Sequence, residues 1–171
     1  DIFKNYQWMT DPKVAGVGAF GDLGTHVLDL LLWFFSDVES VSATFTKIYN
    51  QYPGCEESGE ALIKFKSGLI ASVAAGWIDI EQPYTIFLSG TKAHARTTID
   101  KLIINENKDG EKIERIEENL PETLPHAFDL FLNALINNDN KNLVTPSEAA
   151  LRSSIMESIY QSEKEKKWIN I

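Results

Sequence analysis

Residues 22–35 constrain the fold more than any other segment, because they predict a helix that is apolar on almost every side. The polar residues Asp22, His26 and Asp29 are confined to one stripe, since spacings of four and three residues place them within about 60° of one another on an α-helix. A helix so rich in leucine and phenylalanine is expected to be buried, and its polar stripe with it. Buried polar groups need partners or a chemical role.

The polar stripe has two interpretations. In the structural one, Asp22 caps the helix and His26 is a core histidine that is hydrogen-bonded to Asp29. In the functional one, Asp22 and His26 form a general acid/base pair, because imidazole titrates near working pH and a carboxylate one turn away can orient it. Gly24 favours the second interpretation, since it costs roughly 1 kcal/mol inside a helix and leaves room beside the stripe for a ligand or another backbone.

The run Gly16-Val17-Gly18-Ala19-Phe20-Gly21 matches the dinucleotide fingerprint G-x-G-x-x-G. That motif binds a nucleotide only when it follows a buried strand in a βαβ unit. Residues 11–15 are too polar and too short for such a strand. We therefore interpret these glycines as a tight turn into the helix and expect no cofactor-binding residue in this chain.

Composition excludes several classes of function. The 171 residues carry a net charge of −9, which disfavours nucleic acids and anionic membranes as partners. The longest apolar run, 27–35, is far shorter than the ~20 residues of a membrane span. No signal peptide is visible, and we expect a cytoplasmic protein. The single cysteine, Cys55, lies in an acidic turn that disfavours a catalytic thiolate, and the histidines form no metal set.

The remaining pattern predicts strands between two groups of helices. A short strand is expected near 6–9, a longer one at 38–49, and a hairpin at 61–78 that turns at Ser67-Gly68. Further strands are expected at 84–89, 95–99, 102–105, 112–116 and 168–171, and helices at 124–136 and after the capping box Thr145-Pro146-Ser147-Glu148. Short turns between successive strands predict a single α+β domain over 1–171, with a predominantly antiparallel open-faced sheet and helices on one face.

The strand at 69–78, which includes Trp77, has apolar or small residues on both faces. No helix remains to cover the second face. We therefore expect this sheet face, with Trp77 in the contact, to be covered by a partner subunit or domain.

Four landmarks resemble the C-terminal domain of the glucose-fructose oxidoreductase/inositol dehydrogenase (Gfo/Idh/MocA) family. The most specific one is Asp22-x-Gly24-x-His26-x-x-Asp29, within a run that starts at Gly16 and follows Trp8. The others, which support the match by their order, are residues 61–68, residues 88–93, and the helix 148–162 before Trp168-Ile169.

The resemblance implies a function that composition alone does not. It implies NAD or NADP bound by an N-terminal Rossmann domain absent from this chain, and hydride transfer to or from a sugar, inositol or related polyol. Asp22 and His26 are then the catalytic pair, with Thr25, Asp29 and Trp8 at the substrate. It also implies a homodimer or homotetramer that forms through the sheet.

The sequence leaves two other classes of function open. One is a stand-alone α+β binding or dimerisation module whose polar stripe is structural. The other is an interaction domain that presents the strand at 69–78. In the enzyme interpretation, the isolated chain neither binds NAD(P) nor turns over a polyol, because no βαβ unit holds the nicotinamide near the reacting carbon.

Overall fold

The computed structural model describes residues 7–80, 86–98 and 100–171; Tyr6, predicted to start the first strand, and the ends of two other predicted strands lie outside them. The chain forms two compact units, Asp1–Asp79 with Val144–Ile171, and Ile80–Leu143, which are described separately. The α+β class with antiparallel open sheets is confirmed. Whether 1–171 folds as one domain stays a prediction.

The first unit contains a four-stranded sheet in the order β3-β2-β1-β8. Its strands are β1 (Val38–Thr46), β2 (Ser58–Phe65), β3 (Ile70–Gly76) and β8 (Ile169–Asn170), and each neighbouring pair is antiparallel. The β2–β3 turn is the predicted one, and Gly68 adopts a φ of 88° that favours glycine. The register places Val41 beside Ile63 and Val73 beside Ala61, so one face of the sheet is continuously apolar.

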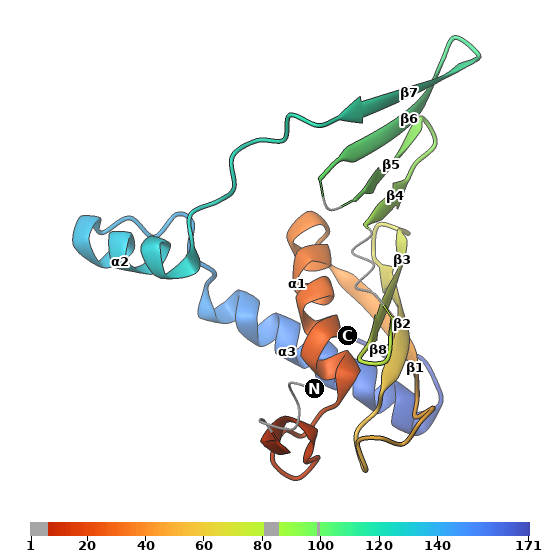
Figure 1. Cartoon of the computed structure of the whole chain (residues 1–171), viewed down its shortest axis with the longest axis vertical. Helices are drawn as coiled ribbons and strands as arrows, with labels where there is room; N and C mark the ends of the chain where they lie inside the picture. The colour runs from red at the N-terminus through yellow and green to blue at the C-terminus, as the bar shows by residue number, and fades with distance from the viewer. Residues whose placement is uncertain (1–6, 81–85, 99) are drawn as a thin grey trace. The chain divides into compact units, whose positions relative to one another are not determined.

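Helical segments cover this apolar face, as expected. They are the short π-helix η3 (Phe20–Gly24), α1 (Thr25–Phe34) and α3 (Pro146–Glu165), and α3 packs along β1. Figure 1 shows α1 and α3 beside the β1–β3 strands. Their contact with the sheet forms the core, which consists of Phe20, Leu28, Val38, Val41, Ala61, Ile63, Phe65, Val73, Ile155, Met156 and Ile159.

The second unit contains its own four-stranded antiparallel sheet, in the order β4-β5-β6-β7. Its strands are β4 (Phe87–Ser89), β5 (Ala93–Thr97), β6 (Leu102–Lys108) and β7 (Glu111–Glu117). The helix α2 (Ala127–Asn137) starts three residues later than Leu124, because the His126 imidazole accepts a hydrogen bond from the Phe128 N–H and caps it. The strand pattern predicted these elements but not their separation into a second sheet.

Two expectations are wrong. Residues Gln7–Thr10 form a 3₁₀ helix, η2, and not a strand, because the chain turns back through hydrogen bonds at 11–16 and has no strand partner there. The helix α1 is not buried on all sides: Leu28 is sealed, whereas Val27, Trp33 and Phe34 are 41%, 72% and 52% exposed. The sheet and α3 cover only part of its circumference.

The last helix begins as predicted. The Thr145 hydroxyl accepts a hydrogen bond from the Glu148 N–H, and the Glu148 carboxylate accepts one from the Thr145 N–H, with Pro146 in the first turn. Among the residues that the structure describes, every helix is too short or too polar to span a lipid bilayer.

Candidate functional site

Asp22 lies in η3, one turn before α1, and is held at both its backbone and its side chain. Its N–H donates to the Gly18 carbonyl at 3.0 Å. Its Oδ2 accepts a hydrogen bond from the indole N–H of Trp77, also at 3.0 Å. The carboxylate therefore does not cap the helix, and its partner comes from the end of β3.

His26 is the second residue of α1, and its side chain is exposed. Within the described part of the chain no hydrogen bond joins it to Asp22 or Asp29. The structural interpretation of His26 as a core histidine is therefore wrong. The imidazole is open to a ligand or to another domain, one helical turn from a carboxylate of fixed position.

Thr25 and Asp29 are brought together by Arg152, a residue that sequence reasoning missed. The Arg152 guanidinium donates from Nη1 to the Thr25 hydroxyl, and its Nε lies 3.7 Å from Asp29 Oδ1. Arg152 and Thr25 also line a hollow of about 310 Å³ between α1 and α3. Arg152 precedes Ile155 and Ile159 on an otherwise amphipathic helix, and no local signal marks it as part of a site.

Trp8 is not brought to the other predicted site residues. It lies in η2 and is 58% exposed. In residues 7–80, 86–98 and 100–171, no hydrogen bond or ring contact links its side chain to Asp22, Thr25, His26 or Asp29. A role for Trp8 at the substrate stays a prediction.

A buried carboxylate occupies the backbone amides of the glycine-rich run. Glu56 Oε1 accepts hydrogen bonds from Gly18 N at 2.8 Å and Gly21 N at 3.4 Å, and from the Tyr160 hydroxyl at 2.5 Å. A Cβ on Gly18 would lie 2.4 Å from the Glu56 carbonyl oxygen, so glycine is required for this packing. These amides are not available for a phosphate, and residues 16–21 do not fit a dinucleotide.

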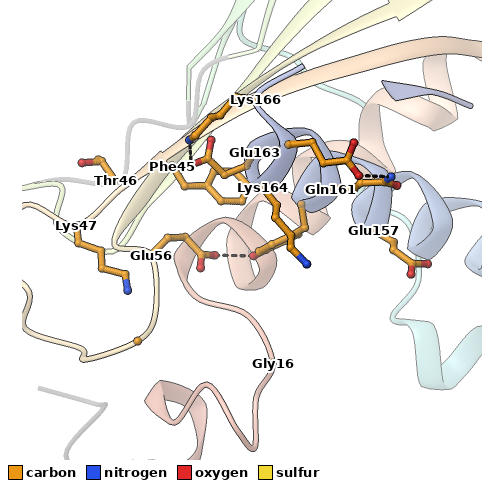
Figure 2. Close-up of a pocket in the computed structure, with 13 residues that line it drawn as sticks. Gly16, Phe45, Thr46, Lys47, Glu56, Glu157, Gln161, Glu163, Lys164 and Lys166 are labelled. Atoms are coloured by element: carbon orange, nitrogen blue, oxygen red, sulfur yellow. Dashed lines mark hydrogen bonds and ion pairs between the residues drawn. The ribbon is translucent and has the colours of Figure 1, made fainter. Parts of the chain in front are cut away.

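The hydrogen bond between Glu56 and α3 is drawn in Figure 2, which views a groove of about 980 Å³. Lys47, Glu157 and Lys164 are among the side chains that line it. None of the five predicted site residues lines this groove, and Asp22 and His26 do not line the smaller hollow. Asp22, in η3, and His26, at the start of α1, thus line neither of these two hollows.

Gly24 serves packing and not ligand access. A Cβ at this position would lie 3.3 Å from the buried Phe20 ring. The expectation that Gly24 leaves room beside the stripe for a ligand is therefore wrong, because the space is filled by a side chain one turn earlier.

Two other kinds of centre, a reactive thiolate and a metal cluster, find no support among the described residues. Burial, followed by the neighbouring charge of Glu56, raises the pKa of the Cys55 thiol, which disfavours a thiolate nucleophile. Among the described residues, no three His, Cys, Asp or Glu side chains gather as metal ligands do.

Known proteins share the family and the fold of this chain. Residues 1–96 match the family model described as the GFO/IDH/MocA C-terminal domain. The curated oxidoreductase P35 of Formosa agariphila is 27% identical over 150 residues. Among solved structures, levoglucosan dehydrogenase in complex with NADH superposes with a TM-score of 0.78 at 18% identity. A putative NADPH-dependent oxidoreductase from Desulfitobacterium hafniense superposes with a TM-score of 0.81 at 19% identity.

This chain spans about half the length of these relatives. The alignments cover 88% of the chain and 46% of the Formosa protein, 96% and 53% for levoglucosan dehydrogenase, and 95% and 51% for the Desulfitobacterium protein. Levoglucosan dehydrogenase has also been solved with NADH together with levoglucosan or L-sorbose.

Proposed function

Because the chain belongs to the GFO/IDH/MocA C-terminal domain family, we propose that it is the substrate-binding and oligomerisation domain of an NAD(P)-dependent oxidoreductase. The substrate is a sugar, inositol or related polyol that reacts at a hydroxyl or carbonyl group. One observation carries the proposal: an exposed imidazole, His26, lies one helical turn from a carboxylate, Asp22, whose side chain is held by Trp77.

The chemistry of this chain is proton transfer. His26 accepts the proton of the substrate hydroxyl during oxidation and returns it during reduction, because imidazole gains and loses a proton near neutral pH. Asp22 lies one turn away, where its carboxylate orients the imidazole. The nicotinamide, when bound by its own domain, supplies the hydride chemistry.

The site is one half of a complete active site. Glu56 accepts hydrogen bonds from the Gly18 and Gly21 amides, so residues 16–21 do not fit a dinucleotide, and the strand pairs of the described residues are all antiparallel. Three apolar residues of α1, Val27, Trp33 and Phe34, are exposed. We propose that a Rossmann domain of the same protein covers them and closes the site.

Substrate contacts come from the residues around the pair. Thr25 and Asp29 are both engaged by Arg152, so a polyol hydroxyl meets a cluster of hydrogen-bond donors and acceptors there. Likeness to a levoglucosan dehydrogenase solved with sugars supports a sugar or polyol as substrate. Trp8, on the surface before this segment, supplies an apolar ring of the kind that packs on sugar faces.

We also propose a homodimer or homotetramer that forms through the open face of the β1–β3 sheet, and a cytoplasmic location. The open face carries Leu62 and Ile70, which are 46% and 67% exposed and lie diagonally opposite on β2 and β3. Trp77 is on the other face, against Asp22, so its predicted place in the subunit contact is wrong.

The decisive experiment is His26→Ala in the full-length protein that carries the nucleotide domain. We expect the rate with a polyol substrate to fall ~100-fold or more, because general acid/base catalysis contributes ~10²–10⁴-fold. Cofactor affinity, measured by nicotinamide fluorescence, should stay nearly unchanged. His126→Ala, which removes a helix-capping imidazole in the other unit, is the matched control.

Two results overturn the proposal. One is full activity of the His26→Ala protein. The other is tight NAD(P) binding by the 171-residue chain alone, which would return the cofactor site to residues 16–21.

A further inference from the structure

Trp77 donates its indole N–H to Asp22 Oδ2 across 55 residues of sequence. We propose that Trp77 is a positioning residue that fixes one oxygen of the Asp22 carboxylate and leaves the other for His26 or the substrate hydroxyl. This inference rests on the proposed function and adds to it a residue from outside the helix.

Trp77 is itself held at two points, its backbone and its ring. Its backbone N–H donates to the Glu57 carbonyl at 2.9 Å, which continues the β2–β3 pairing by one residue. The Trp77 and Tyr52 rings meet in a T-shaped contact, with ring centroids 5.3 Å apart and an interplanar angle of 84°. A tryptophan held both at its backbone and at its ring presents its indole N–H in one direction.

The segment that carries Tyr52 is fixed in turn by a buried carboxylate. Glu57 is fully buried and accepts hydrogen bonds from the backbone N–H groups of Ile48, Tyr49 and Gln51 at 2.7, 2.8 and 2.5 Å. The loop at 47–57 therefore closes on itself beside β2. Trp77 thus contacts a rigid platform rather than a free loop.

The backbone of Asp22 is fixed independently by the neighbouring glutamate. Glu56 holds Gly18 N through its carboxylate and Ala19 N through its carbonyl oxygen, and the Gly18 carbonyl accepts the Asp22 N–H. Glu56 thus fixes the backbone of Asp22. Its neighbour Glu57 fixes the side chain of Asp22 through the loop and Trp77. A carboxylate that only capped a helix needs no such second support.

The first arm of the test needs no catalysis. The chain has four tryptophans, so Trp77→Phe assigns the indole N–H resonance of Trp77 in a two-dimensional ¹⁵N spectrum of the 171-residue protein. In Asp22→Ala, that proton resonance should move upfield because its acceptor is gone. The Trp168 indole resonance, from a site with no such partner among the described hydrogen bonds, should stay in place. An unmoved Trp77 resonance overturns the proposal whatever the enzyme does.

The second arm measures kinetics in the full-length protein. Trp77→Phe keeps a ring against Tyr52 and removes the N–H. We expect kcat to fall about tenfold to a hundredfold, the range for losing a hydrogen bond to a charged group, with KM changed less than about threefold. Trp168→Phe should keep the parent kcat. Should Trp77→Phe not fold, benzothienylalanine at position 77 keeps the bicyclic shape and lacks the N–H.

A double-mutant cycle separates positioning from general destabilisation. If Trp77 acts through Asp22, the double variant Asp22→Ala/Trp77→Phe should be no slower than Asp22→Ala alone. Additive losses, or a normal kcat in Trp77→Phe while His26→Ala is impaired, overturn the role of Trp77 and leave the proposed function standing. Full activity of His26→Ala instead overturns the proposed function, and the positioning role with it.

Discussion

The Tyr160 hydroxyl donates a hydrogen bond to the buried Glu56 carboxylate at 2.5 Å, and this bond ties the last helix to the start of the first. Burial raises the pKa of Tyr160, and so do the hydrogen bond to Glu56 and the negative charge of Glu56. The phenol therefore stays protonated and remains a donor. Glu56 in turn holds the Gly18 and Gly21 amides that precede α1. The position of Asp22 therefore depends on α3.

We predict that Tyr160→Phe lowers the free energy of unfolding by about 1.5–3 kcal/mol, because it removes a hydrogen bond to a buried charged group and keeps the ring. The ring contact with Phe45, at 4.9 Å between centroids, should survive. Urea unfolding followed by tryptophan fluorescence measures the change. Tyr49→Phe, at an exposed tyrosine, is the control and should change stability by less than about 0.5 kcal/mol. Equal stability of Tyr160→Phe and the parent protein contradicts the prediction.

We predict that protonation of Glu57 lowers the stability of the protein in acid. Burial by itself raises the pKa of this carboxyl, but hydrogen bonds from the backbone N–H groups of Tyr49, Gln51, Ile48 and Asn50 outweigh it, and the pKa is lowered. A carboxylate whose folded-state pKa lies below its unfolded value, ~4.3 for Glu, stabilises the fold above that value. That contribution is lost as the pH falls through the lowered pKa.

Glu57→Gln should therefore destabilise the protein at pH 7 and flatten its stability curve below about pH 4.3. Urea unfolding at a series of pH values measures both effects. Glu157→Gln, at an exposed position on α3, should follow the parent curve. Parallel curves for Glu57→Gln and the parent protein would show that the loop hydrogen bonds do not hold the ionised form.

The sequence predicted those features whose signals are local. Thr145 and Glu148 are three residues apart, and this capping box predicts the start of α3. Ser67-Gly68 predicts the turn between β2 and β3. The stripe on α1 is likewise a matter of helical spacing. Periodicity does not show which strands share a sheet, so it does not predict the second sheet, and the short apolar run near Trp8, which predicts a strand, forms a 3₁₀ helix.

The supports of the candidate site could not be predicted, because they join residues that are remote in sequence. Trp77 and Asp22 are 55 residues apart, Tyr160 and Glu56 are 104, and Arg152 and Thr25 are 127. Each of these side chains has an ordinary role in its own element. Only the fold brings the donor to its acceptor.

Arg152 should contribute to substrate binding rather than to proton transfer. It donates to Thr25 and pairs with Asp29 beside His26, so Arg152→Ala frees two groups that we place at the substrate. We predict that KM for the polyol rises roughly fivefold, equivalent to about 1 kcal/mol for a partly exposed hydrogen-bonded pair, with a smaller effect on kcat.

Steady-state kinetics of the full-length protein measure this split. Arg115→Ala, which removes an arginine paired with Glu117 on the exposed surface of β7, should leave both constants unchanged. A fall in kcat as large as that of His26→Ala, with KM unchanged, would assign Arg152 to the reacting centre and contradict the prediction.

The open face of the β1–β3 sheet should form the subunit contact. Its exposed apolar residues are Leu62 and Ile70, and its other members on β3 include the small residues Ser72 and Ala74, which allow close approach of a second sheet. We predict that the protein is a dimer or tetramer at micromolar concentration and that Ile70→Asp shifts it to monomer, because the substitution replaces an apolar side chain of the contact by a carboxylate that loses its water when the contact forms. Light scattering coupled to size exclusion measures the mass of each species.

Val14→Asp, at an apolar residue that is 64% exposed in another part of the same unit, should keep the parent mass. A parent protein that is already monomeric, or an Ile70→Asp variant of unchanged mass, rules out this face as the interface.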